Sequence, residues 1–208
     1  MDKLYFYYAA MNAGKSTTLL QADFNYRERG MQTMLWTADL DDRAGAGTIG
    51  SRIGLEAGAN RYSDDTNLFD AVVRELIKRK LDCILVDEAQ FLTRDHVLQL
   101  CRITDDLKIP VLCYGLRTDF QANLFPGSAA LLALADTLIE LKAVCECGRK
   151  ATMNLRVDAE GHAVAAGAQT EIGGNDRYVA LCRRHFFKRL RESEARQLSL
   201  EIPRAAGA

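Results

Sequence analysis

The sequence predicts an α/β protein in which helices cover both faces of a parallel sheet, with a small β-rich module after it. As far as residue 143, apolar runs of strand length alternate with segments of helical pattern. Continuous apolar strands that alternate with helices are typical of a parallel sheet whose two faces are both buried. After residue 143 this alternation gives way to closely spaced cysteines and a Gly-Gly turn. The change indicates a second, smaller unit.

The individual elements follow from this pattern in chain order. The expected strands cover residues 4–9, 32–37, 83–87, 111–115 and 137–141. The expected helices cover residues 15–29, 67–80, 93–107 and 128–135, and Gly30 would end the first of them. Right-handed crossovers would connect the strands. Residues 41–60 contain five glycines and are expected to form a mobile loop that orders on binding, or else a connection without a functional role.

The composition limits the class of protein. Of the 208 residues, 48% are apolar and 26% charged, which suffices for the packed core of one domain with a small module. The net charge of −1 lacks the basic excess of a general nucleic-acid binder, so we expect no nucleic acid as a partner. We find no apolar run of about 18 residues and no signal-peptide pattern. We therefore expect a cytoplasmic protein without a membrane span, divided into a domain (1–143), a module (144–190) and a tail (191–208).

A phosphate-binding loop is predicted directly after the first strand. An aromatic and apolar run leads into Gly14-Lys15-Ser16, and a helical segment follows. In a P-loop, main-chain N–H groups cradle the phosphates, the Lys neutralises their charge and the Ser hydroxyl binds Mg²⁺. Ala9 stands where the first Gly is usual, a change that is serious only if φ there is positive. The alternative is a chance Gly-Lys-Ser in an ordinary turn. The residues expected to hold the nucleotide are Ala9, Ala10, Met11, Asn12, Ala13, Gly14, Lys15 and Ser16.

A second phosphate signal is a buried apolar strand that ends in two acids, Asp87 and Glu88. In a P-loop protein of the RecA-like type, the first acid at such a strand end holds Mg²⁺, usually through water. Asp87 fits that role, and Glu88 is placed to polarise an attacking nucleophile. The spacing does not separate an NTPase, which activates water, from a kinase, which activates a substrate hydroxyl. The alternative is a solvated strand end.

Four residues of the module have the spacing of a metal site. Cys145 and Cys147 flank one residue, and Cys182 precedes His185 by three positions. Three thiolates and one imidazole make a closed tetrahedral Zn²⁺ site with no open position, so the zinc would be structural. The alternative is reduced cysteines without a metal and a surface histidine. The other cysteines, expected to pack as small hydrophobes, are Cys83, Cys101 and Cys113, and the histidines expected on the surface are His96 and His162.

Further motifs occur in one order along the chain. Residues 11–17 read Met-Asn-Ala-Gly-Lys-Ser-Thr, residues 87–91 read Asp-Glu-Ala-Gln-Phe, and residues 114–120 read Tyr-Gly-Leu-Arg-Thr-Asp-Phe. The Cys145/Cys147 turn, Ile-Gly-Gly at 172–174, and Tyr178 with Cys182 follow. Through these motifs, residues 3–190 resemble the thymidine kinases of the class that includes bacterial enzymes and the human cytosolic enzyme.

The resemblance implies transfer of the γ-phosphoryl group of ATP to the 5′-hydroxyl group of thymidine, which gives dTMP and ADP. Glu88 is similar to the family's general base. Lys15, Ser16 and Asp87 are similar to its phosphate and Mg²⁺ residues. Such roles suit phosphoryl transfer, which depends mainly on positioning and charge neutralisation. The other residues that the resemblance places near ATP are Asp41, Arg43, Ala89 and Gln90.

The resemblance also implies a thymidine site. Phe120 is similar to the ring that stacks on thymine, and residues 169–173 are similar to a lasso loop that holds the base through main-chain hydrogen bonds. An aromatic ring suits a flat base. The residues that the resemblance places around thymidine are Met11, Phe91, Leu116, Phe120, Thr152, Gln169, Thr170, Glu171, Ile172, Gly173 and Tyr178.

The resemblance further implies a homotetramer that the end product dTTP inhibits, with thymidine and ATP as ligands and deoxyuridine as a second candidate substrate. A zinc module would anchor both ends of the lasso. A function of another class stays open at this point. It is a P-loop ATPase module whose zinc knuckle contacts a nucleic-acid or protein partner, although the near-neutral charge argues against it.

Overall fold

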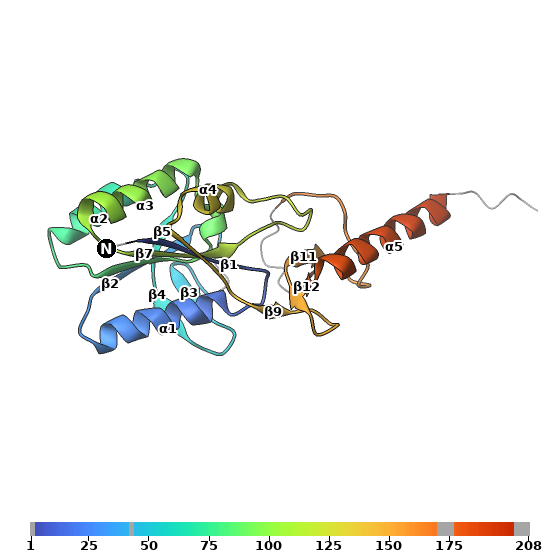
Figure 1. The fold of residues 1–208 in the computed structure, drawn as a ribbon, viewed down its shortest axis with the longest axis horizontal. Coiled ribbons are helices and arrows are strands. Elements are labelled where there is room, and N and C mark those ends of the chain that lie inside the picture. Colours follow the sequence, from blue (N-terminus) through green and yellow to red (C-terminus); the bar gives the residue numbers. More distant parts are fainter. Residues whose placement is uncertain (1–2, 42–43, 170–176, 202–208) are drawn as a thin grey trace, which may run out of the picture.

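The structure, a computed structural model, describes residues 3–41, 44–169 and 177–201 (Figure 1). Its largest sheet has six strands in the order β5-β2-β6-β7-β1-β8, and all neighbours are parallel. These strands are β1 (Leu4–Ala9), β2 (Thr33–Ala38), β5 (Asn60–Tyr62), β6 (Cys83–Val86), β7 (Val111–Leu116) and β8 (Thr137–Glu140). The parallel sheet is confirmed, and the five expected strands lie within one residue of their predicted bounds.

Helices cover the sheet on both faces, as Figure 1 shows. On one face, α2 (Leu68–Leu76), α3 (Arg94–Leu107) and α4 (Pro126–Leu134) pack side by side. On the other face, α1 (Lys15–Glu28) lies alone among these helices. Each face has its own cluster of buried apolar side chains, with Val72 and Leu100 in the first and Leu19 and Leu85 in the second. Strands β2, β6 and β7 are therefore buried from both sides, which accounts for their continuous apolar sequences.

The strand order brings the predicted site residues to one edge of the sheet. β6, β7 and β1 are neighbours, and Ala9 at the end of β1 is opposite Leu116 at the end of β7. Because the strands are parallel, the segments that follow them emerge at the same edge. The P-loop leaves β1 there, and the 3₁₀ helix η1 (Ala89–Phe91) follows β6 two residues further on.

The expected loop over residues 41–60 is wrong for the part that the structure describes. β3 (Thr48–Gly50) and β4 (Glu56–Gly58) form an antiparallel pair, and β5 then joins the edge of the main sheet. Ile49 is only 2% exposed and belongs to the apolar cluster beneath α1. Strands of three residues are too short to show a period of two, and the glycines between them hid the pattern.

Two smaller expectations are also corrected. α2 ends at Leu76 instead of residue 80 because the N–H groups of Lys78 and Arg79 both donate to the carbonyl of Glu75, which tightens the last turn. His96 is 1% exposed and not a surface residue. Its Nδ1 accepts a hydrogen bond from the N–H of Thr93 and so caps the start of α3. The ring therefore acts as a structural cap.

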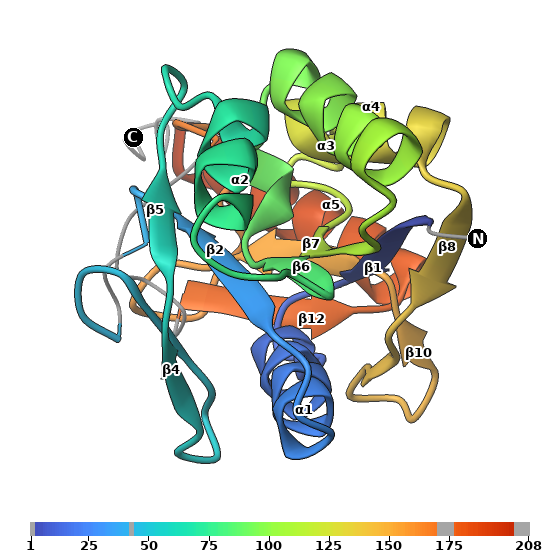
Figure 2. The same ribbon diagram turned by 90° about the vertical axis from the view of Figure 1, so that its left-hand side faces the viewer.

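The module lies beyond the carboxyl edge of the sheet (Figures 1 and 2). It contains the antiparallel pairs β9 (Ala143–Val144) with β10 (Lys150–Ala151) and β11 (Met153–Arg156) with β12 (Tyr178–Leu181), followed by α5 (Arg183–Glu201). Its apolar cluster includes Leu155, Leu181 and Phe186, and also Ala10 of the P-loop. The module thus packs directly against the phosphate loop.

Helix α5 crosses position 190, where we expected the module to end and a tail to begin. The chain after residue 190 is therefore helical as far as Glu201, and residues 202–208 lie outside the described residues. Among the residues that the structure describes, we find no helix with the length and apolar character that crossing a bilayer requires.

Candidate active site

The P-loop has the backbone conformation that its sequence predicts. β1 ends at Ala9 and α1 begins at Lys15. Gly14 precedes the helix with a φ of 76°, a left-handed value that glycine adopts without strain. The carbonyl of Gly14 accepts the N–H of Thr18 at 2.9 Å, which starts the helix. Ala9 is strand and does not occur among the described residues with positive φ, so alanine fits where the first glycine is usual.

The loop places the buried ammonium group of Lys15 and the hydroxyl group of Ser16 at the start of α1. Lys15 is 9% exposed, and its Nζ lies 3.3 Å from the carbonyl oxygen of Ala10, to which it donates. Ser16 Oγ donates to Asp87 Oδ2 at 2.8 Å. The first free N–H groups of α1 point from this same end of the helix, which attracts anions. A triphosphate here would meet N–H groups, an ammonium and a hydroxyl together.

Asp87 and Glu88 follow β6 and are both buried, at 2% and 8% exposure. The main-chain N–H of Glu88 donates to Asp87 Oδ1 at 3.0 Å. Burial and the neighbouring Glu88 carboxylate raise the pKa of Asp87 to about 7, against the opposing effects of Ser16, the Glu88 N–H and Lys15. Ionising both of these buried carboxyl groups is unfavourable unless a cation binds between them. The pair is therefore suited to a divalent cation.

Glu88 is held in an unusual conformation from two sides. Its φ is 51°, a left-handed value that is uncommon for residues other than glycine. Tyr62 OH donates to its carbonyl oxygen at 2.9 Å, and Gln90 Nε2 donates to its carboxylate. Strained residues persist only where neighbours fix them, and they concentrate at functional sites. The contacts of Tyr62 and Gln90 thus give the carboxylate one fixed position.

Gln90 also ties this segment to the end of β7. Its Oε1 accepts the N–H of Leu116 at 2.9 Å, and it is 1% exposed. Gly115 lets the two segments approach, since a Cβ there would lie 2.9 Å from the N atom of Gln90. Gln90 therefore joins the Glu88 carboxylate to the end of β7. Phe91 packs edge-on against Phe125, with ring centroids 5.9 Å apart.

Asn154, on β11 of the module, is a site residue that sequence reasoning missed. Its Oδ1 accepts the N–H of Met11 at 2.7 Å, and its Nδ2 donates to the carbonyl of Thr118 at 2.8 Å. It is 2% exposed. Arg117 donates to the carbonyl of Thr152, the residue before β11, at 3.1 Å. One module strand therefore holds both the P-loop and the segment after β7.

A signal for this strand does exist in the sequence. Residues 153–157 read Met-Asn-Leu-Arg-Val, with polar and apolar residues in alternation. Alternation usually marks one buried face and one solvated face. In the structure both faces are buried, and the polar face with Asn154 and Arg156 is turned to the segments around the P-loop. Sequence alone could not show that protein covers this face.

Three residues expected around a base are linked to Arg156 or to Asp119. Phe120 is 1% exposed, and the guanidinium carbon of Arg156 lies 3.6 Å from its ring centroid. Tyr178 is the cross-strand partner of Arg156. Gln169 Nε2 donates to Asp119 Oδ2 at 2.8 Å, next to Phe120 in the chain. The predicted residues Arg43, Thr170, Glu171, Ile172 and Gly173 lie outside the described residues.

The four predicted metal ligands meet in the module. Cys145 and Cys147 lie on the turn between β9 and β10, Cys182 follows β12, and His185 lies in the first turn of α5. Their ligand atoms all lie within 4.8 Å of one another. Cys145 Sγ is 3.4 Å from His185 Nδ1, and Cys147 Sγ is 3.9 Å from Cys182 Sγ. Gly148, with a φ of 78°, makes the turn that brings the first two together.

This cluster fits a tetrahedral zinc ion. With Zn–S bonds of about 2.3 Å, two thiolates of a tetrahedral site lie about 3.7 Å apart, close to the Cys147–Cys182 separation. Burial would raise the pKa of Cys145, but hydrogen bonds from the main chain of Cys147 and Cys182 and from His185 bring it down to about 6. A thiol with this pKa readily supplies the thiolate that a metal needs. Cys83 and Cys113, as expected, are fully buried in the apolar core.

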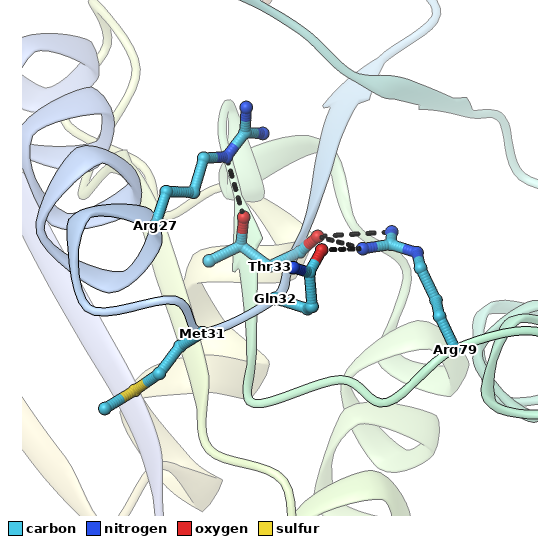
Figure 3. A pocket seen from close by; sticks show the side chains of 5 residues that line it. All are labelled: Arg27, Met31, Gln32, Thr33 and Arg79. Carbon is cyan, nitrogen blue, oxygen red and sulfur yellow. Dashed lines mark hydrogen bonds between the residues drawn. The ribbon is translucent and has the colours of Figure 1, made fainter.

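A separate hollow of about 390 Å³ opens near the start of β2 (Figure 3). Arg27 and Arg79 line it, but Arg27 already pairs with Asp23 of its own helix, and Arg79, which follows α2, pairs with Glu75 of that helix. Arg79 also donates to the carbonyl of Thr33 at 3.2 Å. Because Thr33 begins β2 while the P-loop follows the end of β1, the hollow lies at the opposite edge of the parallel sheet. It is not part of the candidate site.

The sheet order, the strand–loop–helix around Lys15 and the buried acids after β6 define a P-loop α/β protein. Comparison with known proteins identifies a particular family within this class. The family model described as thymidine kinase matches residues 2–186. Proteins named thymidine kinase are 72% identical in Novosphingobium aromaticivorans and 64% identical in Zymomonas mobilis, covering 89% and 91% of this chain and 97% and 98% of those relatives. The chain therefore belongs to the thymidine kinase family.

One further relative and one solved structure complete the comparison. The protein named thymidine kinase from Jannaschia sp. is 62% identical over 89% of this chain and 95% of its own length. The crystal structure of Pif1 helicase from Candida albicans is similar over 68% of this chain and 36% of its own, with a TM-score of 0.41 and 15% identity. A score that low carries no argument about this protein.

Proposed function

We propose that this protein transfers the γ-phosphoryl group of ATP to the 5′-hydroxyl group of thymidine. Membership of the thymidine kinase family supports the proposal. The observation that carries it is the placement of Ser16, Asp87 and Glu88. A hydroxyl group bonded to a buried acid provides a cation site, and a second buried acid follows it directly in the chain. These are the groups that phosphoryl transfer to an alcohol requires.

The phosphate side of the reaction would rely on the P-loop. N–H groups of the loop and of the start of α1 would hold the β- and γ-phosphates, and Lys15 would neutralise part of their charge. Ser16 and Asp87 would hold Mg²⁺, which would supply positive charge that offsets the charge of the phosphates. The 2.8 Å contact between Ser16 Oγ and Asp87 Oδ2 supports a shared cation at this point.

The acceptor side would rely on Glu88. Its carboxylate would take the proton of the 5′-hydroxyl group as the oxygen attacks phosphorus, the role of a general base. Gln90, which donates to this carboxylate, would keep it aimed at one point. The low solvent exposure of both residues supports a role that excludes water, because an open site would hydrolyse ATP instead.

Thymidine would lie between the P-loop and the module. Phe120 would stack on the base, and Met11, Leu116 and Thr152 would surround its methyl group. The links of Asn154 to Met11 and to Thr118 support this arrangement, because they connect the P-loop wall to the segment that carries Phe120. Gln169 and Tyr178 would flank the base, and residues 170–173 would read its edge through the main chain.

The remaining parts of the proposal concern the assembly. The cluster of Cys145, Cys147, Cys182 and His185 would hold a structural zinc ion, which ties α5 to the β9–β10 turn. A homotetramer, a cytoplasmic location and inhibition by dTTP are proposed from the family alone.

Deoxyuridine is proposed as a weaker substrate, since it lacks only the methyl group that Met11, Leu116 and Thr152 would contact.

The nucleoside dependence of ADP release tests the proposed function. The protein is incubated with Mg·ATP and, in separate reactions, thymidine, deoxyuridine, deoxycytidine, deoxyadenosine or no nucleoside. Turnover with thymidine, or with thymidine and deoxyuridine, is the expected result. Turnover that ignores the nucleoside would contradict the proposal and favour an ATPase that acts with another partner.

A further inference from the structure

Arg156 is a charged residue in the protein interior, where charged side chains are rare. It belongs to β11 and is only 5% exposed. Its guanidinium lies over the face of the Phe120 ring, 3.6 Å from the centroid to the guanidinium carbon. A buried guanidinium stacked on an aromatic ring is attracted to it and restrains it. Arg156 therefore covers one face of the Phe120 ring.

Main-chain carbonyls fix the guanidinium in turn. Arg156 Nη1 donates to the carbonyl of Ala168 at 3.1 Å, and Nη2 donates to that of Ala166 at 3.3 Å. The segment packs so tightly on the guanidinium that a Cβ at Gly167 would collide with Arg156 Nη2. Gly167 has a φ of 136°, a value that other residues rarely adopt. The conformation therefore favours glycine at this position, and any larger residue would have to displace the guanidinium of Arg156.

A second set of contacts joins the same two segments. Gln169 Nε2 donates to Asp119 Oδ2 at 2.8 Å, and Gln121 Nε2 donates to the carbonyl of Ala165 at 3.2 Å. Asp119 Oδ1 accepts the N–H groups of Gln121 and Asn123 at 2.9 Å and so shapes the turn that presents Phe120. The residues on both sides of Phe120 are thus bound to the residues on both sides of Gly167.

We propose that Arg156 is a positioning residue for the nucleoside: it packs on one face of the Phe120 ring and so fixes the orientation of the ring that would stack on the base. The inference rests on the proposed function, which gives Phe120 its role. Arg156 acts through the ring and does not touch the reacting phosphates. Its planar fork is needed because only a flat group can stack on the ring while it donates to two carbonyls, so lysine does not replace it.

Two variants disturb this contact by different routes. Arg156→Met keeps the length of the side chain and removes the fork, and Gly167→Ala keeps Arg156 but forces the guanidinium off its place. We expect both to raise the KM for thymidine about tenfold, with the KM for ATP and the zinc content unchanged. Gly161→Ala is the matched control, since Gly161 also has a positive φ, 84°, but nothing lies within 4 Å of its Cβ position. It places alanine at another positive φ without the collision.

A coupled substitution separates positioning from general stability. In a Phe120→Leu background, which removes the ring, Arg156→Met should change the KM for thymidine by less than about twofold. A residue that only stabilises the module would lower the melting temperature and raise both KM values, with and without the ring. That result would overturn the proposal, and so would an unchanged KM for thymidine in both single variants.

Assays of the wild-type protein distinguish a failure of the proposed function from a failure of the proposed role of Arg156. Wild-type turnover of thymidine with normal KM values in Arg156→Met and Gly167→Ala refutes the role of Arg156 alone. Lack of wild-type turnover of thymidine refutes the proposed function itself. An effect of Gly161→Ala equal to that of Gly167→Ala would assign the loss to backbone strain and would also refute the role of Arg156.

Discussion

Ser16 Oγ donates a 2.8 Å hydrogen bond to Asp87 Oδ2, although the two residues lie 71 positions apart. The hydroxyl comes from the first turn of α1 and the carboxylate from the end of β6. The parallel sheet brings them together, because the segments that follow β1 and β6 emerge at one edge. This contact marks the place where the fold can hold a cation against phosphates.

The first prediction concerns Glu88. Glu88→Gln keeps the shape of the side chain but removes the base, so we expect kcat to fall by about 10²–10⁴ with little change in thymidine binding. Steady-state kinetics and thymidine titration measure the two effects. Gln90→Leu, which deletes the donor to this carboxylate, should lower kcat to a smaller extent. Full activity in Glu88→Gln would remove Glu88 from the mechanism.

The second prediction concerns the pH dependence of folding in the metal-free protein. The pKa of Asp87 is raised to about 7, whereas an Asp in an unfolded chain titrates near 4. Between these values the folded protein binds more protons than the unfolded chain, so the free energy of unfolding falls as pH rises. The contribution of Asp87 to the free energy of unfolding is fully present below about pH 4 and is lost as the pH rises through about 7.

Asp87→Asn tests this assignment because the amide does not titrate. We expect the difference in unfolding free energy between Asp87→Asn and the wild-type protein to grow in favour of the variant from about pH 5 to about pH 8. Urea denaturation at several pH values measures it. A pH-independent difference would mean that Asp87 carries its charge throughout and that its pKa is not raised.

The third prediction concerns the metal cluster. Cys147→Ser removes one ligand, so we expect zinc content to fall, the melting temperature to drop and the KM for thymidine to rise together. Plasma mass spectrometry measures the metal. Cys101→Ser is the matched control, since Cys101 is a half-buried thiol of α3 outside the cluster. A folded Cys147→Ser protein without zinc and with wild-type kinetics would separate the metal from the thymidine site.

The fourth prediction concerns Asn154. Asn154→Ala deprives the Met11 N–H and the Thr118 carbonyl of their partner, which should cost about 1–3 kcal/mol of stability. Asn25→Ala, which removes an exposed hydrogen bond on α1, should cost much less. Urea denaturation compares them. Equal costs would show that the bridge between the P-loop and the module adds nothing to the fold.

Much of this architecture could be predicted from the sequence because it rests on local patterns. The main strands are continuous apolar runs, and the P-loop needs only Gly14, Lys15 and Ser16 in order between a strand and a helix. The spacing of the cysteines also predicted the cluster in which Cys145 and His185 lie close together in the structure. Each of these signals lies within a few residues of chain.

Other features depend on contacts between distant segments and left no local signal. β5 is recognised as a strand only because it pairs with β2. The burial of His96 depends on its contact with the carbonyl of Thr66. Arg156 and Asn154 look like the solvated face of a strand until Phe120 and the P-loop are placed against them. The conformation of Glu88 likewise depends on Tyr62, from another strand.

The most direct test of the central claim follows both products in one reaction. The wild-type protein is supplied with Mg·ATP and thymidine, and dTMP and ADP are quantified by chromatography alongside Glu88→Gln. We predict equal amounts of dTMP and ADP from the wild-type protein and neither above background from the variant. ADP without dTMP, or dTMP at wild-type rates in the variant, would contradict the account.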